Sequence, residues 1–360
     1  MNSISGKKWL ESKIHNNILE KIKQDFNFSE IISKIIISRN FGEKEIYLIE
    51  NFLQIPNIFK DNNDYKKAIE IILYSIKNKE KICILGDYDV DGSAATALLV
   101  RFLKYIDHPY FFYIPDREKD GYGASKKLFT KLVLKKPHLI IMVDCGSTSN
   151  EAIDYLNSKK IKSIIIDHHE IYKPYPNANI ILNPKKNNGY EKYNYLCATT
   201  LTYFFIVHLS KKMKSEFKIK DYLLYVLFAT ICDVMPLRNL NRLIAIETLR
   251  DFKIDTFFFL KTIYDIMNIK SKITINQIGY LIGPILNSGG RLNKSNYATE
   301  LLVSDNNKFI LKRTNQLIVL NEKRKKIEEN ILRNINFSKI TKQNKDVVIY
   351  YDPSINEGLI

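Results

Sequence analysis

The chain contains the segment Ile82-Cys83-Ile84-Leu85-Gly86-Asp87-Tyr88-Asp89-Val90-Asp91-Gly92. Its first four apolar residues predict a short buried strand, and three aspartates at every second position follow directly. The apolar spacing after Gly92 predicts a helix over residues 93–106. Three carboxylates this close repel one another, so one would take up a proton unless a cation lay among them. The pattern favours a site for a hard divalent metal ion, although a solvated acidic turn would show the same residues.

The region from residue 81 to residue 183 alternates short apolar runs with helical stretches. The predicted strands lie at 82–85, 110–114, 139–143, 163–166 and 180–182, and predicted helices near 93–106, 124–135 and 150–159 separate the first four. An amphipathic helix over 65–76 leads into the first strand. This alternation predicts an α/β fold with a doubly wound, mostly parallel sheet. Such sheets bind their ligands at the carboxyl ends of the strands.

Polar side chains follow four of these strands. They are Asp87, Asp89 and Asp91 after the first strand, Asp116 after the second, Asp144 after the third, and Asp167, His168 and His169 after the fourth. Because parallel strands end at one edge of a sheet, we expect a single site there. Adjacent histidines beside an aspartate can offer one imidazole to a metal ion while the carboxylate orients a ring. A helix cap at Asp144 and an ordinary buried histidine are the alternatives.

Two later segments carry further candidates. An apolar, helix-like run over 222–231 leads to Asp233, and a carboxylate among apolar neighbours needs a partner, either the metal ions or a helix end. Residues 283–292 place glycines around Asn287 and Arg291. That composition predicts a loop whose amides and guanidinium approach a phosphate, or else a tight structural turn. Residues 184–220 show no regular pattern, so we expect them to be irregular.

Composition narrows the class of protein. A chain of 360 residues, 45% of them hydrophobic, can bury a sizeable core in more than one domain. It has no apolar run long enough for a membrane span, and its four widely spaced cysteines predict a reduced, cytoplasmic protein. The net charge of +16 favours a polyanionic partner such as nucleic acid. The abundance of Lys, Ile and Asn is typical of an AT-rich genome. Codon bias can therefore account for part of the positive charge, which makes the charge weaker evidence for a nucleic-acid partner.

Five motifs resemble, in order, those of the DHH phosphoesterases, and among these most closely the bacterial RecJ single-strand-specific exonucleases. They lie at residues 86–92, 143–146, 167–169, 233–237 and 283–292, and the resemblance extends from about residue 30 to residue 360. It implies a 5′-to-3′ exonuclease on single-stranded DNA that releases 5′-mononucleotides with two manganese or magnesium ions. Recombination and repair are the implied processes, with a single-strand-binding protein and a helicase as further partners.

The resemblance also implies roles for individual residues. It implies metal ligands at Asp89, Asp91, Asp144, His168 and Asp233, with Asp144 as the bridge, Asp87 as a further ligand or outer acid, Asp167 as the orienter of the histidines, and His169, Asn287 and Arg291 at the scissile phosphate. The sequence departs from the family where an arginine is usual and Ile285 stands, and where Ser288-Gly289-Gly290 replaces Ala-Ala-Gly. A glycine-rich turn is also replaced, by Ala198-Thr199-Thr200. These departures concern phosphate binding rather than the metal ligands.

The expected division of the chain has four parts. They are a helical lead-in over 1–62, a DHH catalytic core over 63–305 whose second half is helical, a long basic connecting helix over 306–336, and the start of an incomplete, DHHA1-like domain over 337–360 with a strand at 347–351. In the family a second domain and an OB-like DNA-binding fold follow, and the resemblance implies that this sequence ends before both, so a C-terminally truncated enzyme is the leading interpretation. The alternatives are an inactive remnant that binds metal or DNA, and a small DHH phosphoesterase acting on nucleotides or short oligonucleotides.

Overall fold

The computed structural model describes residues 6–8, 10, 13–50, 55–56, 58–59, 61–120, 123–186, 189–250 and 252–334. The chain divides into two compact units. The first consists of Met1–Pro56 together with Arg238–Leu243, and the second of Asn57–Leu237 together with Ile244–Ile360. The four-part division expected from sequence stays a prediction, because its last part lies in 335–360, outside the described residues.

The first unit is helical. It contains α1 (Asn16–Phe26), α2 (Glu30–Ser38) and α3 (Glu43–Glu50). Phe28, Ile36 and Ile46 form its small buried cluster. Arg238 joins this unit through an ion pair with Glu45, and its guanidinium lies 5.2 Å from the centre of the Phe41 ring.

The second unit is built on a parallel sheet of five strands, as the sequence predicts. The strands are β1 (Ile82–Leu85), β2 (Tyr110–Tyr113), β3 (Leu139–Val143), β4 (Lys162–Ile166) and β5 (Ile180–Leu182). Their order is β2-β1-β3-β4-β5, and every neighbouring pair is parallel. All residues of β1 and β3 are buried, which accounts for their uninterrupted apolar sequences.

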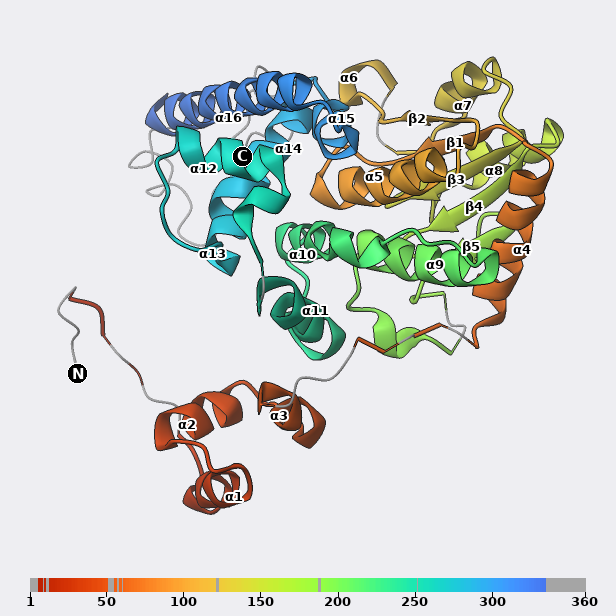
Figure 1. Ribbon diagram of the computed structural model, residues 1–360. Coiled ribbons are helices and arrows are strands. Elements are labelled where there is room, and N and C mark those ends of the chain that lie inside the picture. The colour runs from red at the N-terminus through yellow and green to blue at the C-terminus, as the bar shows by residue number, and fades with distance from the viewer. Residues whose placement is uncertain are drawn as a thin grey trace, which may run out of the picture. The chain divides into compact units, whose positions relative to one another are not determined.

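Helices cover both faces of this sheet (Figure 1). The helices of this half of the unit are α4 (Asn63–Lys77), α5 (Val90–Tyr105), the short α6 (Arg117–Asp120), α7 (Lys126–Val133) and α8 (Asn150–Ser158). On one face, α7 and α8 share a core with alternate strand residues such as Cys83, Ile140 and Ile165. On the other face lie α5 and α9, a helix of the second half of the chain.

The strand order fixes where a ligand can bind. From β1 the chain passes to β2 on one side, whereas β3 lies on the other side of β1. This reversal of direction opens a crevice at the carboxyl ends of β1 and β3, the usual ligand site of doubly wound sheets. The aspartates after β1 and Asp144 after β3 flank that crevice.

The second half of this unit is helical. Its elements are η1 (Glu191–Tyr193), α9 (Ala198–Met213), η2 (Ile219–Tyr222), α10 (Leu223–Cys232), η3 (Ile254–Thr256), α12 (Phe258–Ile266), α13 (Ile275–Gln277), the π-helix η4 (Ile278–Ile282), α14 (Gly283–Arg291), α15 (Tyr297–Val303) and α16 (Asn307–Asn334). Helix α11 (Asn239–Arg250) belongs to the first unit up to Leu243 and to the second from Ile244. The long helix expected near its end is present as α16. Among the described residues, no helix combines the length and apolar character that crossing a membrane requires.

The prediction that residues 184–220 are irregular is wrong. Helix α9 occupies sixteen of them, and eleven of its residues are buried. A helix covered on nearly every side carries apolar residues all round, so it lacks the 3.6-residue periodicity by which amphipathic helices are recognised.

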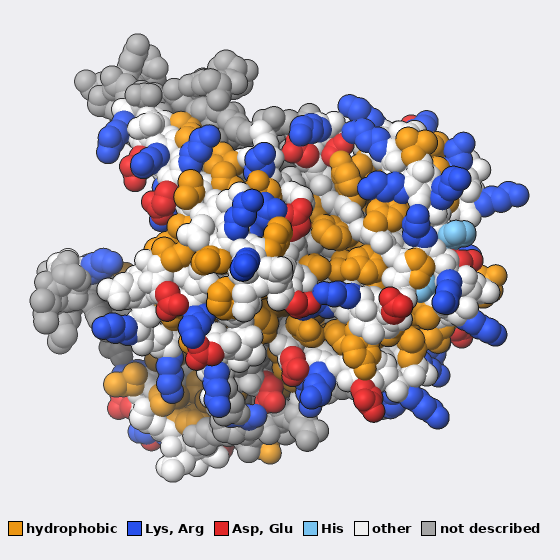
Figure 2. All heavy atoms as spheres, turned by 45° about the horizontal axis from the view of Figure 1, so that its top comes forward, with side chains coloured by type: hydrophobic (Ala, Val, Ile, Leu, Met, Phe, Trp, Pro, Cys, Tyr) orange, Lys and Arg blue, Asp and Glu red, His pale blue; other side chains and the backbone are white. Residues whose placement is uncertain are grey.

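Basic side chains are abundant on the surface. Figure 2 shows Lys and Arg side chains spread over the visible face, with apolar side chains between them and fewer acids. This distribution agrees with the net charge of +16.

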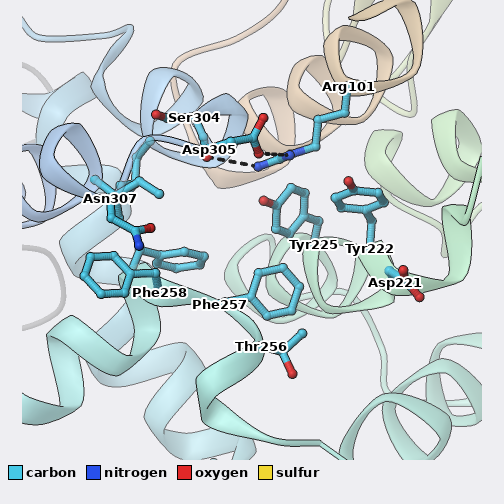
Figure 3. A pocket seen from close by; sticks show the side chains of 13 residues that line it. Arg101, Asp221, Tyr222, Tyr225, Thr256, Phe257, Phe258, Ser304, Asp305 and Asn307 are labelled. Atoms are coloured by element: carbon cyan, nitrogen blue, oxygen red, sulfur yellow. Dashed lines mark hydrogen bonds and ion pairs between the residues drawn. The ribbon is translucent and has the colours of Figure 1, made fainter. Parts of the chain in front are cut away.

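Arg101 of α5 connects the sheet to the helical half. Its Nε donates to the carbonyl oxygen of Leu302 at 2.8 Å, and its Nη1 lies 2.9 Å from Asp305 Oδ1. Leu302 is in the last turn of α15, where carbonyl groups lack partners within the helix. The guanidinium also lies 5.2 Å from the centre of the Tyr222 ring, beside a pocket of 340 Å³ with aromatic walls (Figure 3).

We expect Arg101→Ala to lower the free energy of unfolding by about 2–3 kcal/mol, because a buried carbonyl oxygen and a carboxylate lose charge-assisted hydrogen bonds. Lys104→Ala is the matched control, since Lys104 pairs with the same Asp305 carboxylate at 2.6 Å but is 54% exposed. Its loss should cost no more than about 1 kcal/mol. Urea denaturation measures both, and equal losses would contradict a structural role for Arg101.

Candidate metal centre

The loop after β1 is shaped by close backbone contacts. Asp89 is the N-cap of α5, and its carboxylate accepts a hydrogen bond from the Gly92 amide at 3.0 Å. A Cβ atom at Gly92 would lie 2.5 Å from the backbone nitrogen of Asp87, so only glycine fits there. The loop therefore folds back on itself and gathers Asp87 and Asp89 at the end of the strand.

Asp91 is buried and joins this loop to α9. Its two carboxylate oxygens accept hydrogen bonds from the amides of Ala198 and Thr199, each at 2.7 Å. The Thr199 hydroxyl in turn donates to the carbonyl oxygen of Asp91 at 2.8 Å. The donors are backbone amides at a helix N-terminus, so replacing a glycine-rich turn by Ala198-Thr199-Thr200 keeps this interaction.

Asp144 occupies a strained position at the end of β3. Its φ is 60°, the left-handed region that non-glycine residues rarely adopt. Its side chain is buried, and its Oδ1 has no hydrogen-bond partner. Helix α8 begins at Asn150 with Ser149 as its N-cap, so Asp144 is not the cap of that helix.

The His168 side chain lies among three carboxylates. Its Nε2 is 3.3 Å from Asp144 Oδ1, 3.4 Å from Asp233 Oδ2 and 3.6 Å from Asp91 Oδ2. Neither ring nitrogen makes a hydrogen bond. Burial lowers the pKa of His168 despite the neighbouring acids. A neutral imidazole with an unpaired nitrogen is the form that binds a metal ion.

Asp167 orients His169 rather than the ring of His168. Its Oδ1 accepts hydrogen bonds from both histidine amides, at 2.8 and 3.2 Å, and from Nδ1 of His169 at 2.8 Å. Its Oδ2 accepts the Ser147 amide at 3.1 Å. Burial alone would raise the pKa of Asp167, but these bonds hold it well below its ordinary value.

His169 is the exposed member of the histidine pair. The hydrogen bond from Asp167 raises the pKa of His169 to about 9, and the side chain is 48% exposed. The imidazole is therefore a cation at neutral pH that faces the solvent beside the buried acids.

Burial and mutual repulsion raise the pKa of three acids. For Asp144 the pKa lies well above its ordinary value, because the site is buried and Asp91 and Asp89 are close. The pKa of Asp89 is raised by burial and by Asp91. The same causes raise the pKa of Asp233 to about 7. A divalent cation would relieve this repulsion directly.

The ligand atoms form three compact groups, each with its atoms within 4.8 Å of one another. The groups are Asp87–Asp89–Asp144, Asp144–His168–His169 and Asp91–His168–Asp233. Asp144 and His168 each belong to two groups, and Asp144 Oδ1, Asp233 Oδ2 and both His168 nitrogens lack hydrogen-bond partners. Carboxylate oxygens suit Mn²⁺ or Mg²⁺. With the unpaired imidazole of His168 as a nitrogen donor, these residues fit a pair of ions that share ligands.

Asp116 lies outside these groups, contrary to the expectation that four strand ends form one site. Its Oδ1 accepts the Lys119 amide at 3.2 Å, a bond in the short helix α6. Its backbone amide donates to Asp120 Oδ2 at 3.1 Å. An aspartate that caps a helix and an aspartate that binds a metal ion give the same sequence pattern, namely an acid directly after a strand.

The predicted loop over 283–292 is wrong, because residues 283–291 form helix α14. Its glycines allow close packing instead of a turn. A Cβ at Gly283 would lie 2.5 Å from Cys232 Sγ, and one at Gly290 would lie 2.4 Å from Cδ2 of Tyr88. Cys232 precedes Asp233, and Tyr88 separates Asp87 from Asp89. Both ends of α14 therefore contact segments that carry the acids.

The polar residues of α14 have different surroundings. Asn287 has a buried Oδ1 without a hydrogen-bond partner, and Arg291 is the last residue of the helix, half-buried. Ile285 is fully buried, so it belongs to the core and cannot replace the arginine usual in the family as a phosphate contact. The amides of this helix are engaged in helical hydrogen bonds, which removes the predicted cradle of free amides.

Sequence reasoning missed the capping of α9 by Asp91. Its partners Ala198 and Thr199 are 107 and 108 residues away from Asp91 in the sequence, and no local pattern links them to it. The threonines after Cys197 were the one available signal, because Thr is common near helix N-termini.

Comparison with known proteins shows what the chain is similar to. The model of the DHH family, N-terminal domain, matches residues 81–230. The single-stranded-DNA-specific exonuclease RecJ of Bacillus subtilis is 25% identical over 90% of this chain, and RecJ of Escherichia coli is 26% identical over 73% of it. These matches cover 41% and 48% of the two relatives, so the chain spans about half of their length.

A solved structure agrees with the fold. The crystal structure of RecJ in complex with Mn²⁺ from Thermus thermophilus superposes with a TM-score of 0.75 at 21% identity, over 89% of this chain and 46% of that one. The likeness therefore extends to the arrangement of the elements. Residues 81–230 thus match the DHH family, N-terminal domain, and the chain is similar over most of its length to RecJ proteins.

Proposed function

We propose that this chain hydrolyses single-stranded DNA from the 5′ end and releases 5′-mononucleotides, using two Mn²⁺ or Mg²⁺ ions. The observation that carries the proposal is the convergence of five aspartates and two histidines whose ligand atoms gather in one crevice, several of them unpaired. The similarity to single-stranded-DNA-specific exonucleases supplies the substrate class. The net charge of +16 favours a polyanionic substrate.

The position of each residue determines the role that we propose for it. Asp89, Asp91, Asp144, His168 and Asp233 would hold the ions, with Asp144 between them and Asp87 as a further ligand or outer acid. Bound divalent ions supply an activated water and neutralise charge on the phosphoryl oxygens. Asp167 keeps Nδ1 of His169 engaged, so the Nε2–H of the cationic ring can donate a hydrogen bond to a phosphate oxygen.

Asn287 and Arg291 are proposed to hold the same phosphate. The Nδ2–H group of Asn287 and the guanidinium of Arg291, four residues later on α14, can both donate hydrogen bonds to a phosphodiester. The proposed processes are recombination and repair. Association with a single-strand-binding protein or a helicase stays a prediction of the family resemblance.

The decisive experiment incubates the chain and Mn²⁺ with single-stranded DNA labelled at either end. We expect 5′-mononucleotides to appear first from the 5′ end, with duplex DNA uncut and EDTA abolishing the reaction. Asp144→Asn should reduce the rate at least about 100-fold, because it removes a shared ligand charge. Asp116→Asn is the matched control, since Asp116 also follows a strand but lies outside the ligand groups; it should retain the wild-type rate.

Other outcomes have distinct meanings. Release from the 3′ end would contradict the polarity alone. Activity confined to dinucleotides would favour a small DHH phosphoesterase. Binding of Mn²⁺ and DNA without cleavage would favour the non-catalytic alternative, and an Asp144→Asn variant as active as wild type would exclude the two-metal site.

The raised acid pKa values predict how stability depends on pH. Asp233 has a pKa of about 7 in the folded, metal-free protein and one near its ordinary value of about 4 when unfolded. Between these values the folded state holds the extra proton, so its contribution to stability is lost as pH rises from about 4 through 7. The melting temperature of the EDTA-treated protein should fall more steeply over this range than that of Asp233→Asn, which cannot lose a proton there.

Metal ions should reverse the trend. Mn²⁺ binds the deprotonated acids, so the increase in melting temperature that it causes should grow with pH in the wild type and be smaller in Asp233→Asn. Differential scanning fluorimetry at several pH values measures both effects. Parallel curves for the two proteins would show that Asp233 does not couple to the site.

A further inference from the structure

Residues 275–291 form one continuous helical segment that leaves one face accessible to solvent. It consists of α13, η4 and α14 in succession. Pro284, Asn287 and Arg291 are half-buried and follow one another at intervals of three and four residues, which places them on one helix face. The residues between them are buried. One turn earlier, Tyr280 extends this face and is 86% exposed.

The same side of the segment lies next to the acid cluster. Asn287 comes four residues after Gly283 and three before Gly290, the two glycines that contact Cys232 and Tyr88. Helix periodicity therefore places Asn287 on the side of α14 that carries these two contacts. The open face thus begins at Tyr280 and leads to the metal centre.

Tyr280 stands on an unusual backbone. The π-helix Ile278–Ile282 inserts a wide turn into the segment, a rare feature that recurs at functional sites. An aromatic ring this exposed contributes almost no buried area to the fold. A Cβ atom at Gly279, the residue before Tyr280, would lie 3.3 Å from Cγ2 of Ile231, so this turn lies against the end of α10.

Val234, just beyond that end of α10, is also exposed without a packing role. Its exposed fraction is 86% and its φ is 54°. The amides of Val234 and Met235 donate to the carbonyl oxygens of Ile231 and Thr230, at 3.2 and 2.9 Å, and so close the helix at a position where glycine is usual. A β-branched residue in this conformation is strained, and strain of this kind clusters at binding sites.

We propose that Tyr280 stacks on a base of the bound single strand, that Val234 makes a neighbouring apolar contact, and that Asn287 and Arg291 hold the backbone on the same helix face. This inference rests on the proposed function. It describes the path over the protein surface, here called the track, that the bound strand follows away from the metal ions. A ring stacks on any base, so the contact adds affinity without reading sequence. Tyr280 is thus a positioning residue for the substrate.

The test moves one abasic nucleotide through a short, labelled single-stranded oligonucleotide. Affinity is measured by fluorescence anisotropy, with Ca²⁺ in place of Mn²⁺. The wild type should lose affinity about 5- to 150-fold when the abasic position is the one that meets Tyr280. Tyr280→Ala should bind intact DNA more weakly by a similar factor and show no further loss at that position, whereas Tyr280→Phe should keep the wild-type profile.

Tyr74→Ala is the matched control, because Tyr74 is another exposed tyrosine, at 54%, on α4. It should keep the wild-type profile. A wild-type scan without a position-specific loss, or a Tyr280→Ala scan that retains it, would overturn the stacking role. Cleavage by the wild type with Mn²⁺ would still support the proposed function, and position-specific binding without cleavage would remove the nuclease proposal alone.

Val234→Gly tests the second contact separately. Glycine adopts a φ of 54° without steric cost, so the melting temperature should rise by about 1–2 °C. Affinity for intact single-stranded DNA should fall several-fold, because the apolar contact is lost. A stabilised variant with wild-type affinity would exclude Val234 from the track, and a lower melting temperature would contradict the strained conformation.

Discussion

Repulsion among buried carboxylates is the constraint on which the site depends. Asp91, Asp144 and Asp167 are almost inaccessible to water, and Asp87, Asp89 and Asp233 lie beside them. The protein compensates only part of this charge, through the α9 amides on Asp91, the Gly92 amide on Asp89 and the His169 contact with Asp167. The oxygens left without partners belong to Asp144 and Asp233. Charge compensation is therefore incomplete at these two acids, where a divalent cation would complete it.

The architecture explains how these acids come together at low conformational cost. Parallel strands end at one edge, and the reversal of strand order between β2 and β3 opens the crevice at that edge. The Asp91 contact with α9 then fixes the helical half onto the sheet, because the acid sits at the N-terminus of a buried helix whose amides need acceptors. One side chain thus serves both the fold and the candidate site, and its removal would disturb both.

The sheet could be predicted because its sequence patterns are local. The parts of the fold that depend on contacts between distant residues could not be predicted. The apolar strands and the acids after them follow one another in sequence, so β1, β3 and the ligand candidates could be recognised from neighbouring residues. Helix α9 was missed because burial on all sides erases periodicity. Helix α14 was taken for a loop because glycine serves turns and close packing alike, and only the contacts of Gly283 and Gly290 distinguish the two uses. Asp116 shows the converse limit, since a cap and a ligand have the same sequence signal.

Two residues at the acid cluster have strained backbones, and in both the side chain is kept although glycine would relieve the strain. Asp144 has a φ of 60° and Val234 a φ of 54°, conformations in which glycine would be more stable. At Asp144 the reason for a side chain is evident, since its oxygen is shared by two ligand groups. At Val234 no packing contact compensates for the strain, because the side chain is almost fully exposed. A strained and exposed side chain of this kind supports the proposed contact with the bound strand, and Val234 directly follows Asp233.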